Sequence, residues 1–181
     1  MRDASVFSQQ WMTVPAATAG DVSPASLLQC YFAFLRRVTC GLVRPESRAD
    51  GVRFRLAGTR ADLIRFLPPR SEVLDGEETL FLAICGGFLV QGKASDRGVL
   101  AFCVAREGEG VRLTLRIADF CPLILGGSRP SRPRKWLYSL TQAYIHRLVT
   151  IRFLAGIYRE LTGSGAPVRV VKAMVVDGEP I

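Results

Sequence analysis

The sequence lacks the short motifs that would identify an enzyme directly. It contains a single histidine, and no two of its five cysteines form the closely spaced pair of a zinc or redox site. Its double glycines at 86–87 and 126–127 lack the spacing of a phosphate-binding loop, and no serine occupies a nucleophile elbow. We therefore expect neither a metal nor a cofactor, and we leave open whether the protein is an enzyme.

Long apolar runs are also missing. The longest, Leu80 to Val90, is far shorter than the roughly 20 residues that a membrane-spanning helix requires. The first residues lack the uninterrupted apolar core of a signal peptide. The cysteines are odd in number and each lies in an apolar run, which favours buried free thiols in a reducing compartment. These features predict a cytoplasmic protein.

Positive charge, by contrast, is abundant. The formal net charge is +8, with 24 Lys and Arg against 16 Asp and Glu. Such a charge permits an anionic partner, nucleic acid included, but says nothing about the fold. The arginines are spread over predicted strands and helices, and no nucleic-acid-binding motif is present. Nucleic acid is therefore an unlikely partner and nucleic-acid binding is the third of our functional hypotheses.

The N-terminal part of the chain predicts one strand and one helix. Residues 5–14 alternate roughly between polar and apolar and favour a strand. Ser23 followed by Pro24 is a typical helix start, with a capping hydroxyl and a proline in the first turn. The apolar residues that follow have helical spacing, and Gly41 marks the end of this helix.

The middle of the chain predicts a meander of strands. Residues 52–56 and 111–117 alternate cleanly, whereas residues 79–90 are apolar at nearly every position. Pro45 restricts the segment around it to an edge strand or a turn. Short gaps between successive strands favour hairpins, so the sheet should be antiparallel. The Gly86–Gly87 pair indicates a bulge or a close approach of another segment.

The last large element is a long amphipathic helix. From Arg134 to Leu161 there is no proline, and such a helix would be about 42 Å long. Gly163 is a natural stop. We predict one domain over residues 1–163 and a tail over 164–181 that adds a strand. Self-association through the edge of that strand, giving a homo-oligomer, is a further hypothesis.

This order of elements predicts an α+β fold, with a curved antiparallel sheet of about six or seven strands gripping a long C-terminal helix. It resembles the helix-grip fold of the START, polyketide-cyclase and birch-pollen-allergen superfamily. The resemblance spans residues 5–161 and rests on element order, with one N-terminal helix where that family usually has two short ones. It implies a hydrophobic cavity between sheet and helix that binds lipids or other apolar or amphiphilic small molecules, with carrier or cyclase-like activity.

The same resemblance suggests which side chains line such a cavity. From the strands and the segments between them we expect Phe54, Phe88, Phe102, Leu115 and Asp119. From the C-terminal helix and its approach we expect Trp136, Tyr144 and Tyr158, although core packing is the more frequent role of tyrosines on such a stripe.

Two residues are candidates for acid–base chemistry. If the alternation through Ile117 continues, Asp119 faces the apolar interior, where its pKa would rise. Alternatively, the strand ends near Ala118 and Asp119 caps a turn. His146 lies one residue off the apolar stripe of the long helix, so it is either a catalytic group or a helix-surface residue.

A basic segment, residues 126–136, connects the last meander strand to the long helix. Its cations are Arg129, Arg132, Arg134 and Lys135, beside Trp136. The helix dipole disfavours cations at a helix N-terminus, so helix stability does not explain them. We expect them to contact an anionic ligand head group or, as the alternative function, an anionic membrane surface.

Overall fold

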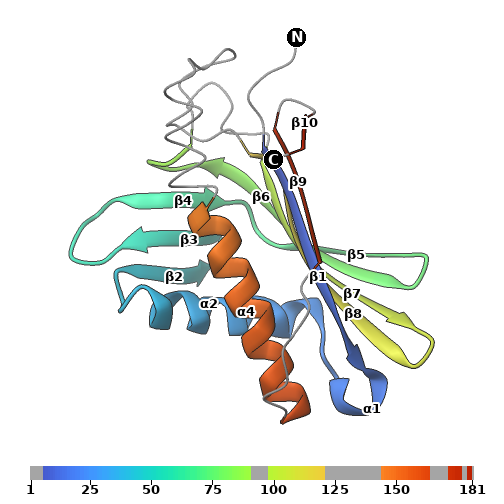
Figure 1. Ribbon diagram of the computed structural model, residues 1–181. Helices are drawn as coiled ribbons and strands as arrows, with labels where there is room; N and C mark the ends of the chain where they lie inside the picture. The colour runs from blue at the N-terminus through green and yellow to red at the C-terminus, as the bar shows by residue number, and fades with distance from the viewer. Residues whose placement is uncertain (1–5, 91–97, 121–143, 164–170, 177–178, 181) are drawn as a thin grey trace.

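The computed structural model describes residues 6–90, 98–120, 144–163, 171–176 and 179–180 (Figure 1). The elements run in the order β1 (Val6–Pro15), α1 (Ala16–Ala19), α2 (Pro24–Val38), β2 (Val43–Arg48), β3 (Gly51–Leu56), β4 (Asp62–Phe66), β5 (Arg70–Leu74), β6 (Glu77–Gly86), β7 (Val99–Glu107), β8 (Gly110–Phe120), α4 (Tyr144–Thr162), β9 (Val171–Val176) and β10 (Glu179–Pro180).

Helix α2 begins as the sequence predicts. Ser23 is the N-cap, and its side chain and that of Ser26 form a reciprocal capping box, with Pro24 in the first turn. Arg36 and Arg37 lie in the last turn, where cations suit the helix dipole. Local chemistry therefore defines the start of this helix and stabilises its last turn.

Helix α4 covers Tyr144 to Thr162 and ends at Gly163, whose φ of 62° marks the predicted stop. The first part of the predicted helix, residues 134–143, lies outside the described residues. None of the described helices is long and apolar enough to cross a membrane.

All described strands form one antiparallel, strongly curved sheet. Its order is β10-β9-β1-β8-β7-β6-β4-β3-β2, and β5 pairs with β6 off this path. Strands β4 and β5 follow one another along the same edge of β6, separated by Pro68 and Pro69. The sheet thus has ten strands, more than expected, because β5 and β10 were not predicted. The strand expected in the tail is β9, which lies between β1 and β10.

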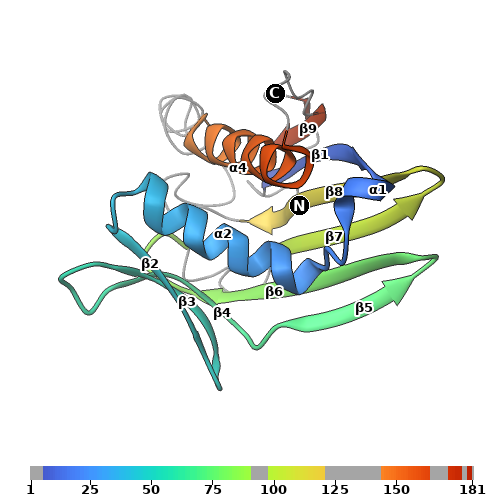
Figure 2. The same cartoon turned by 90° about the horizontal axis from the view of Figure 1, so that it is seen from below.

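Two helices, not one, cover the concave face of this sheet (Figure 2). Helix α4 packs on β1, while α2 packs on β2, β6 and β7. The predicted alternation holds on β8, where Val111, Leu113, Leu115 and Ile117 are all buried. The predicted fold class, an α+β protein with a curved antiparallel sheet and a C-terminal helix, is confirmed.

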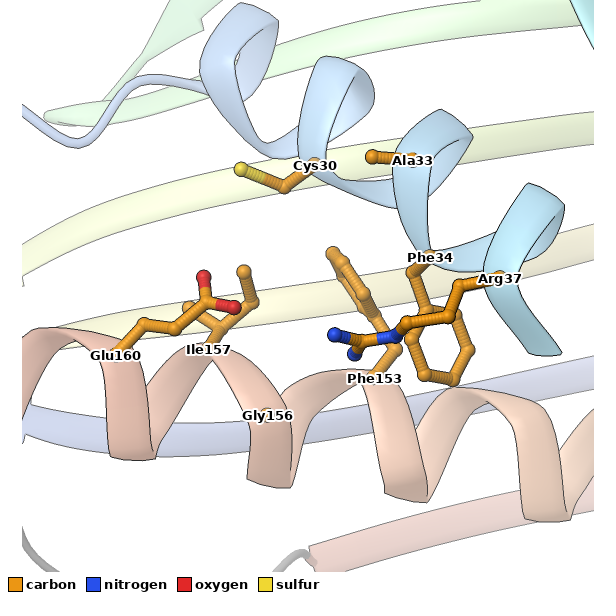
Figure 3. A pocket seen from close by; sticks show the side chains of 8 residues that line it. All are labelled: Cys30, Ala33, Phe34, Arg37, Phe153, Gly156, Ile157 and Glu160. Carbon is orange, nitrogen blue, oxygen red and sulfur yellow. The ribbon is translucent and has the colours of Figure 1, made fainter.

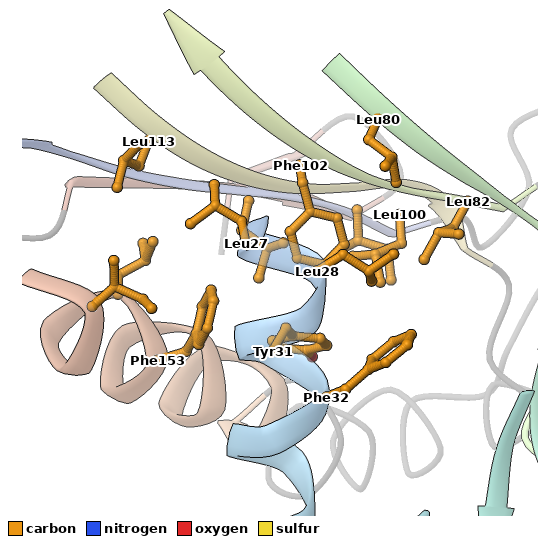
Figure 4. Packing of buried hydrophobic residues seen from close by; sticks show 14 of the residues in the cluster. Leu27, Leu28, Tyr31, Phe32, Leu80, Leu82, Leu100, Phe102, Leu113 and Phe153 are labelled. Atoms are coloured by element: carbon orange, nitrogen blue, oxygen red, sulfur yellow. The ribbon is translucent and has the colours of Figure 1, made fainter. Parts of the chain in front are cut away.

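An aromatic cluster joins the two helices to the sheet (Figure 4). The ring of Tyr31 on α2 lies 5.5 Å from that of Phe102 on β7 and 5.1 Å from that of Phe153 on α4, both edge-on. Edge-to-face pairs of this kind stabilise a core beyond simple burial. Side chains of α2 therefore fill the central space between the sheet and α4.

The predicted alternation of β8 breaks at Asp119. The strand runs to Phe120, and its pairing with β1 shifts register between Val6 and Ser8. Asp119 takes a positive φ of 51° and is exposed, while Phe120 is buried in its place. Asp119 therefore neither faces the interior nor follows the end of the strand, because a β-bulge reverses the alternation at this point.

Candidate ligand pocket

The most apolar described pocket lies to one side of the aromatic cluster, with a volume of about 320 Å³. Its walls come from the C-terminal half of α2, from the β2–β4 part of the sheet, and from the segments around Leu89, Phe120 and Val149. The lining residues are Tyr31, Leu35, Thr39, Val43, Phe54, Leu63, Ile64, Leu89, Phe120 and Val149. Eight of these ten residues are aliphatic or Phe, so the pocket favours an apolar occupant.

Backbone hydrogen bonds between residues 62–63 and 88–89 hold one wall of the pocket in place. The amide of Leu89 donates to the carbonyl of Leu63 at 3.0 Å, and that of Phe88 to Asp62 at 2.9 Å. Gly87 makes this approach feasible, since its φ is 125° and a Cβ would lie 2.5 Å from the Leu63 carbonyl oxygen. The Gly86–Gly87 pair thus marks a close approach, as predicted, and the β4–β6 pairing shifts register next to it.

Tyr31 and Thr39 supply the polar groups of the lining. The Thr39 hydroxyl donates to the Leu35 carbonyl at 2.7 Å and accepts from the Val43 amide at 3.0 Å, so it is already engaged. Tyr31 is 3% exposed as a residue, and its hydroxyl is the second polar group of the lining. Burial raises the pKa of Tyr31, so this hydroxyl stays protonated and retains its proton for donation.

The residues predicted to line a cavity have different locations. Phe54 lines the pocket. Phe102 and Leu115 are 1% and 4% exposed and belong to the packed core, and Tyr158 is partly buried against that core. Phe88, in contrast, is 67% exposed, because the Gly87 turn directs Leu89 rather than Phe88 to the pocket wall.

The remaining predicted residues belong to the chain around the N-terminus of α4. Tyr144 and His146 lie in the first turn of α4, where only the backbone is described. The predicted contacts Arg129, Arg132, Arg134, Lys135 and Trp136 lie outside the described residues. The membrane alternative that rests on them stays a prediction.

Tyr31 lines the pocket but is not among the residues that the sequence predicts for a site. Its spacing indicates only a position on the apolar face of α2. A signal was available, because a buried tyrosine hydroxyl usually finds a hydrogen-bond partner and hence marks a polar point in an apolar region.

A second pocket, of about 210 Å³, lies in the groove between α2 and α4 (Figure 3). Arg37 lies towards one end and Glu160 towards the other, with Cys30 on the α2 wall. Although Cys30 is exposed as a residue, desolvation of its thiol in the groove, and secondarily the charge of Glu160, raise the pKa of this thiol. The thiol therefore carries less thiolate than an ordinary cysteine and is a poor nucleophile.

The cysteines depart from the expectation of uniform burial. Cys103 is buried and Cys85 half-buried, but Cys30 and Cys40 are exposed, and all four are free. Both exposed thiols lie on or just after the amphipathic helix α2, where an apolar-looking run includes solvent-facing positions. Within the described residues, no group of three His, Cys, Asp or Glu side chains could hold a metal ion.

The architecture defines the class of protein: a curved antiparallel sheet with a C-terminal helix, compatible with a helix-grip arrangement. No family model, no curated protein and no solved structure matches this chain. The fold and the pocket therefore carry the functional argument by themselves.

Proposed function

We propose that this protein binds a small, mainly apolar molecule with one polar group in the pocket beside Tyr31. The pocket carries this proposal, because it combines an apolar lining with the hydroxyl-bearing side chain of Tyr31. Its volume of about 320 Å³ is at the lower end of small-molecule sites. Membership of the START and polyketide-cyclase superfamily, which the element order resembles and whose members bind apolar ligands, would agree with this function.

The Tyr31 hydroxyl determines which class of ligand the pocket prefers. A ligand oxygen that accepts a hydrogen bond from the Tyr31 hydroxyl would gain about 1 kcal/mol of binding free energy. The ligand class is thus an alcohol, ketone or carboxylic acid on a compact apolar body. Because Tyr31 stays protonated, its role in this proposal is to orient the ligand rather than to transfer a proton.

Naphthalene and 2-naphthol test the polar contact, since they differ only in one hydroxyl. Titration calorimetry or fluorescence should show tighter binding of 2-naphthol to the wild-type protein. Tyr31→Phe should weaken 2-naphthol by roughly fivefold, the value of one hydrogen bond, and leave naphthalene unchanged. Equal weakening of both compounds would show that Tyr31 acts only in packing.

A substitution that fills the pocket tests where the ligand binds. Leu89→Trp inserts a large ring at the pocket wall and should abolish binding of both compounds. Phe88→Trp is the matched control, because it introduces the same ring one residue away on a side chain that is 67% exposed. Failure of the wild-type protein to bind either compound at millimolar concentration, or equal effects of the two tryptophans, would refute the proposal.

A further inference from the structure

The sheet has three outer strands among the described residues, and two of them are protected against further pairing. On β2, Pro45 has no amide hydrogen to donate, and its carbonyl accepts from Nη2 of Arg36 at 2.7 Å. Strand β10 has only two residues, of which one is Pro180. Proline and very short edge strands are the usual means of preventing edge-to-edge association.

Strand β5 has neither protection. It pairs with β6 alone among the described strands, without a bulge, and contains no proline (Figure 1, Figure 2). All five of its residues are exposed, and Val73 and Leu74 reach 72% and 73%. An open, regular edge strand with exposed apolar side chains is a template for another strand.

The sequence of this edge shows which strand fits it. Residues 68–74 read PPRSEVL, and all seven are exposed. When two copies of this segment run antiparallel about Ser71, apolar side chains meet apolar ones and cations meet anions. Within β5, Arg70 faces Glu72 and Ser71 faces Ser71. Beyond these backbone pairs, the side chains of Val73 and Leu74 lie beside Pro69 and Pro68, which precede β5 and add apolar contact but no amide donor.

We propose that two copies of this protein associate through β5, with Ser71 on the two-fold axis. Such an interface is isologous, so Arg70 of each copy faces Glu72 of the other and the ion pair forms twice. Directly opposed charges of opposite sign stabilise a strand pair, whereas like charges destabilise it. A register shifted so that Glu72 faces itself is disfavoured for this reason. The interface is separate from the ligand pocket and does not depend on it.

Charge exchange tests the pairing in the full-length protein. Sedimentation velocity should show a concentration-dependent dimer. Arg70→Glu and Glu72→Arg each place like charges opposite one another and should each raise the dimer Kd by roughly tenfold or more. The double variant Arg70→Glu/Glu72→Arg should restore it. An equimolar mixture of the two single variants should form a heterodimer, because their charges are complementary.

The matched control is Arg44→Glu, which reverses an exposed cation on the protected edge strand β2 and should leave the dimer unchanged. Circular dichroism of each variant establishes that the fold persists. A wild-type protein that stays monomeric at millimolar concentration would overturn the proposal. So would a dimer that the single variants leave unchanged, or that the double variant does not restore.

Cross-linking tests the register. Ser71→Cys, in a background of Cys30→Ser and Cys40→Ser, places two thiols on the two-fold axis and should give a covalent dimer under mild oxidation. Val73→Cys in the same background faces Pro69 of the second copy and should cross-link much more slowly. Equal cross-linking of the two variants, or of the background itself, would exclude this register.

Discussion

Gln10 offers the sharpest test of the packing between β1 and α4. It lies on the concave face of β1 and is 1% exposed. Its Nε2 donates to Oγ of Ser8 at 3.2 Å, but within the described chain its Oε1 is buried without a hydrogen-bond partner. The Ser8 hydroxyl can satisfy only one end of the amide, so the other end remains unpaired.

The size of the effect follows from these two observations. Gln10→Met keeps nearly the same volume and removes the orphan oxygen, which costs about 1–3 kcal/mol in the folded state. It also loses the hydrogen bond to Ser8, which contributes about 1 kcal/mol. Adding Ser8→Ala removes the hydroxyl left behind. The double variant should therefore be more stable by about 1 kcal/mol, which raises the Tm by roughly 2–4 °C for a chain of this size.

Urea and thermal unfolding of the wild type, both single variants and the double variant form the appropriate cycle. Gln9→Met is the matched control, because Gln9 is half-buried on the opposite face of the same strand, and its free energy of unfolding should change by less than about 0.5 kcal/mol. A double variant that loses more than 1 kcal/mol relative to the wild type would refute the reasoning, since it would mean that the Gln10 carbonyl has a stabilising partner.

Four further predictions test the helices, the pocket wall and the inter-helix groove. Phe153→Ala removes the ring that joins α4 to Tyr31 and should cost about 3–5 kcal/mol in urea unfolding. Gly156→Ala should stabilise the protein by about 0.5–1 kcal/mol, because a Cβ there meets nothing within 4 Å and the helix gains propensity. Gly87→Ala should destabilise it by roughly 2 kcal/mol or more, as the new Cβ collides with the backbone of β4. Glu160→Gln removes a negative charge that raises the pKa of the Cys30 thiol, so the pKa falls and site-resolved alkylation at a fixed mildly alkaline pH becomes faster; an unchanged rate would contradict this.

Features determined by local chemistry were predictable from the sequence. The N-cap at Ser23, the stop at Gly163 and the alternation of Val111 to Ile117 each depend on neighbouring residues in the chain. The curved antiparallel sheet followed from the short gaps between strands. The aromatic residue Phe54 was correctly placed on the buried face of β3, and it also lines the pocket.

Features determined by tertiary contacts were not predictable in the same way. The bulge at Asp119 depends on the register with β1, a strand more than 100 residues earlier. Strand β5 is short and fully exposed, so it has no alternating pattern to detect, although the Asp75–Gly76 turn that joins it to β6 is a typical hairpin signal. That α2 lies beside α4 on the concave face is a property of the assembled layers. The position of the pocket beside α2 follows from it.

One interruption between two strands accounts for both a wall of the pocket and the open edge of the sheet. Strands β4 and β5 share one edge of β6, and Pro68–Pro69 separates them. Before the break, β4 also pairs with β3, and this part of the sheet contributes Phe54, Leu63 and Ile64 to the pocket. After the two prolines, β3 no longer lies alongside, because its first residues already pair with the end of β4. Strand β5 therefore continues without an outer neighbour among the described strands. The same interruption therefore gives the proposed ligand pocket one of its walls and leaves β5 as the unpaired strand at which we propose that a second copy binds.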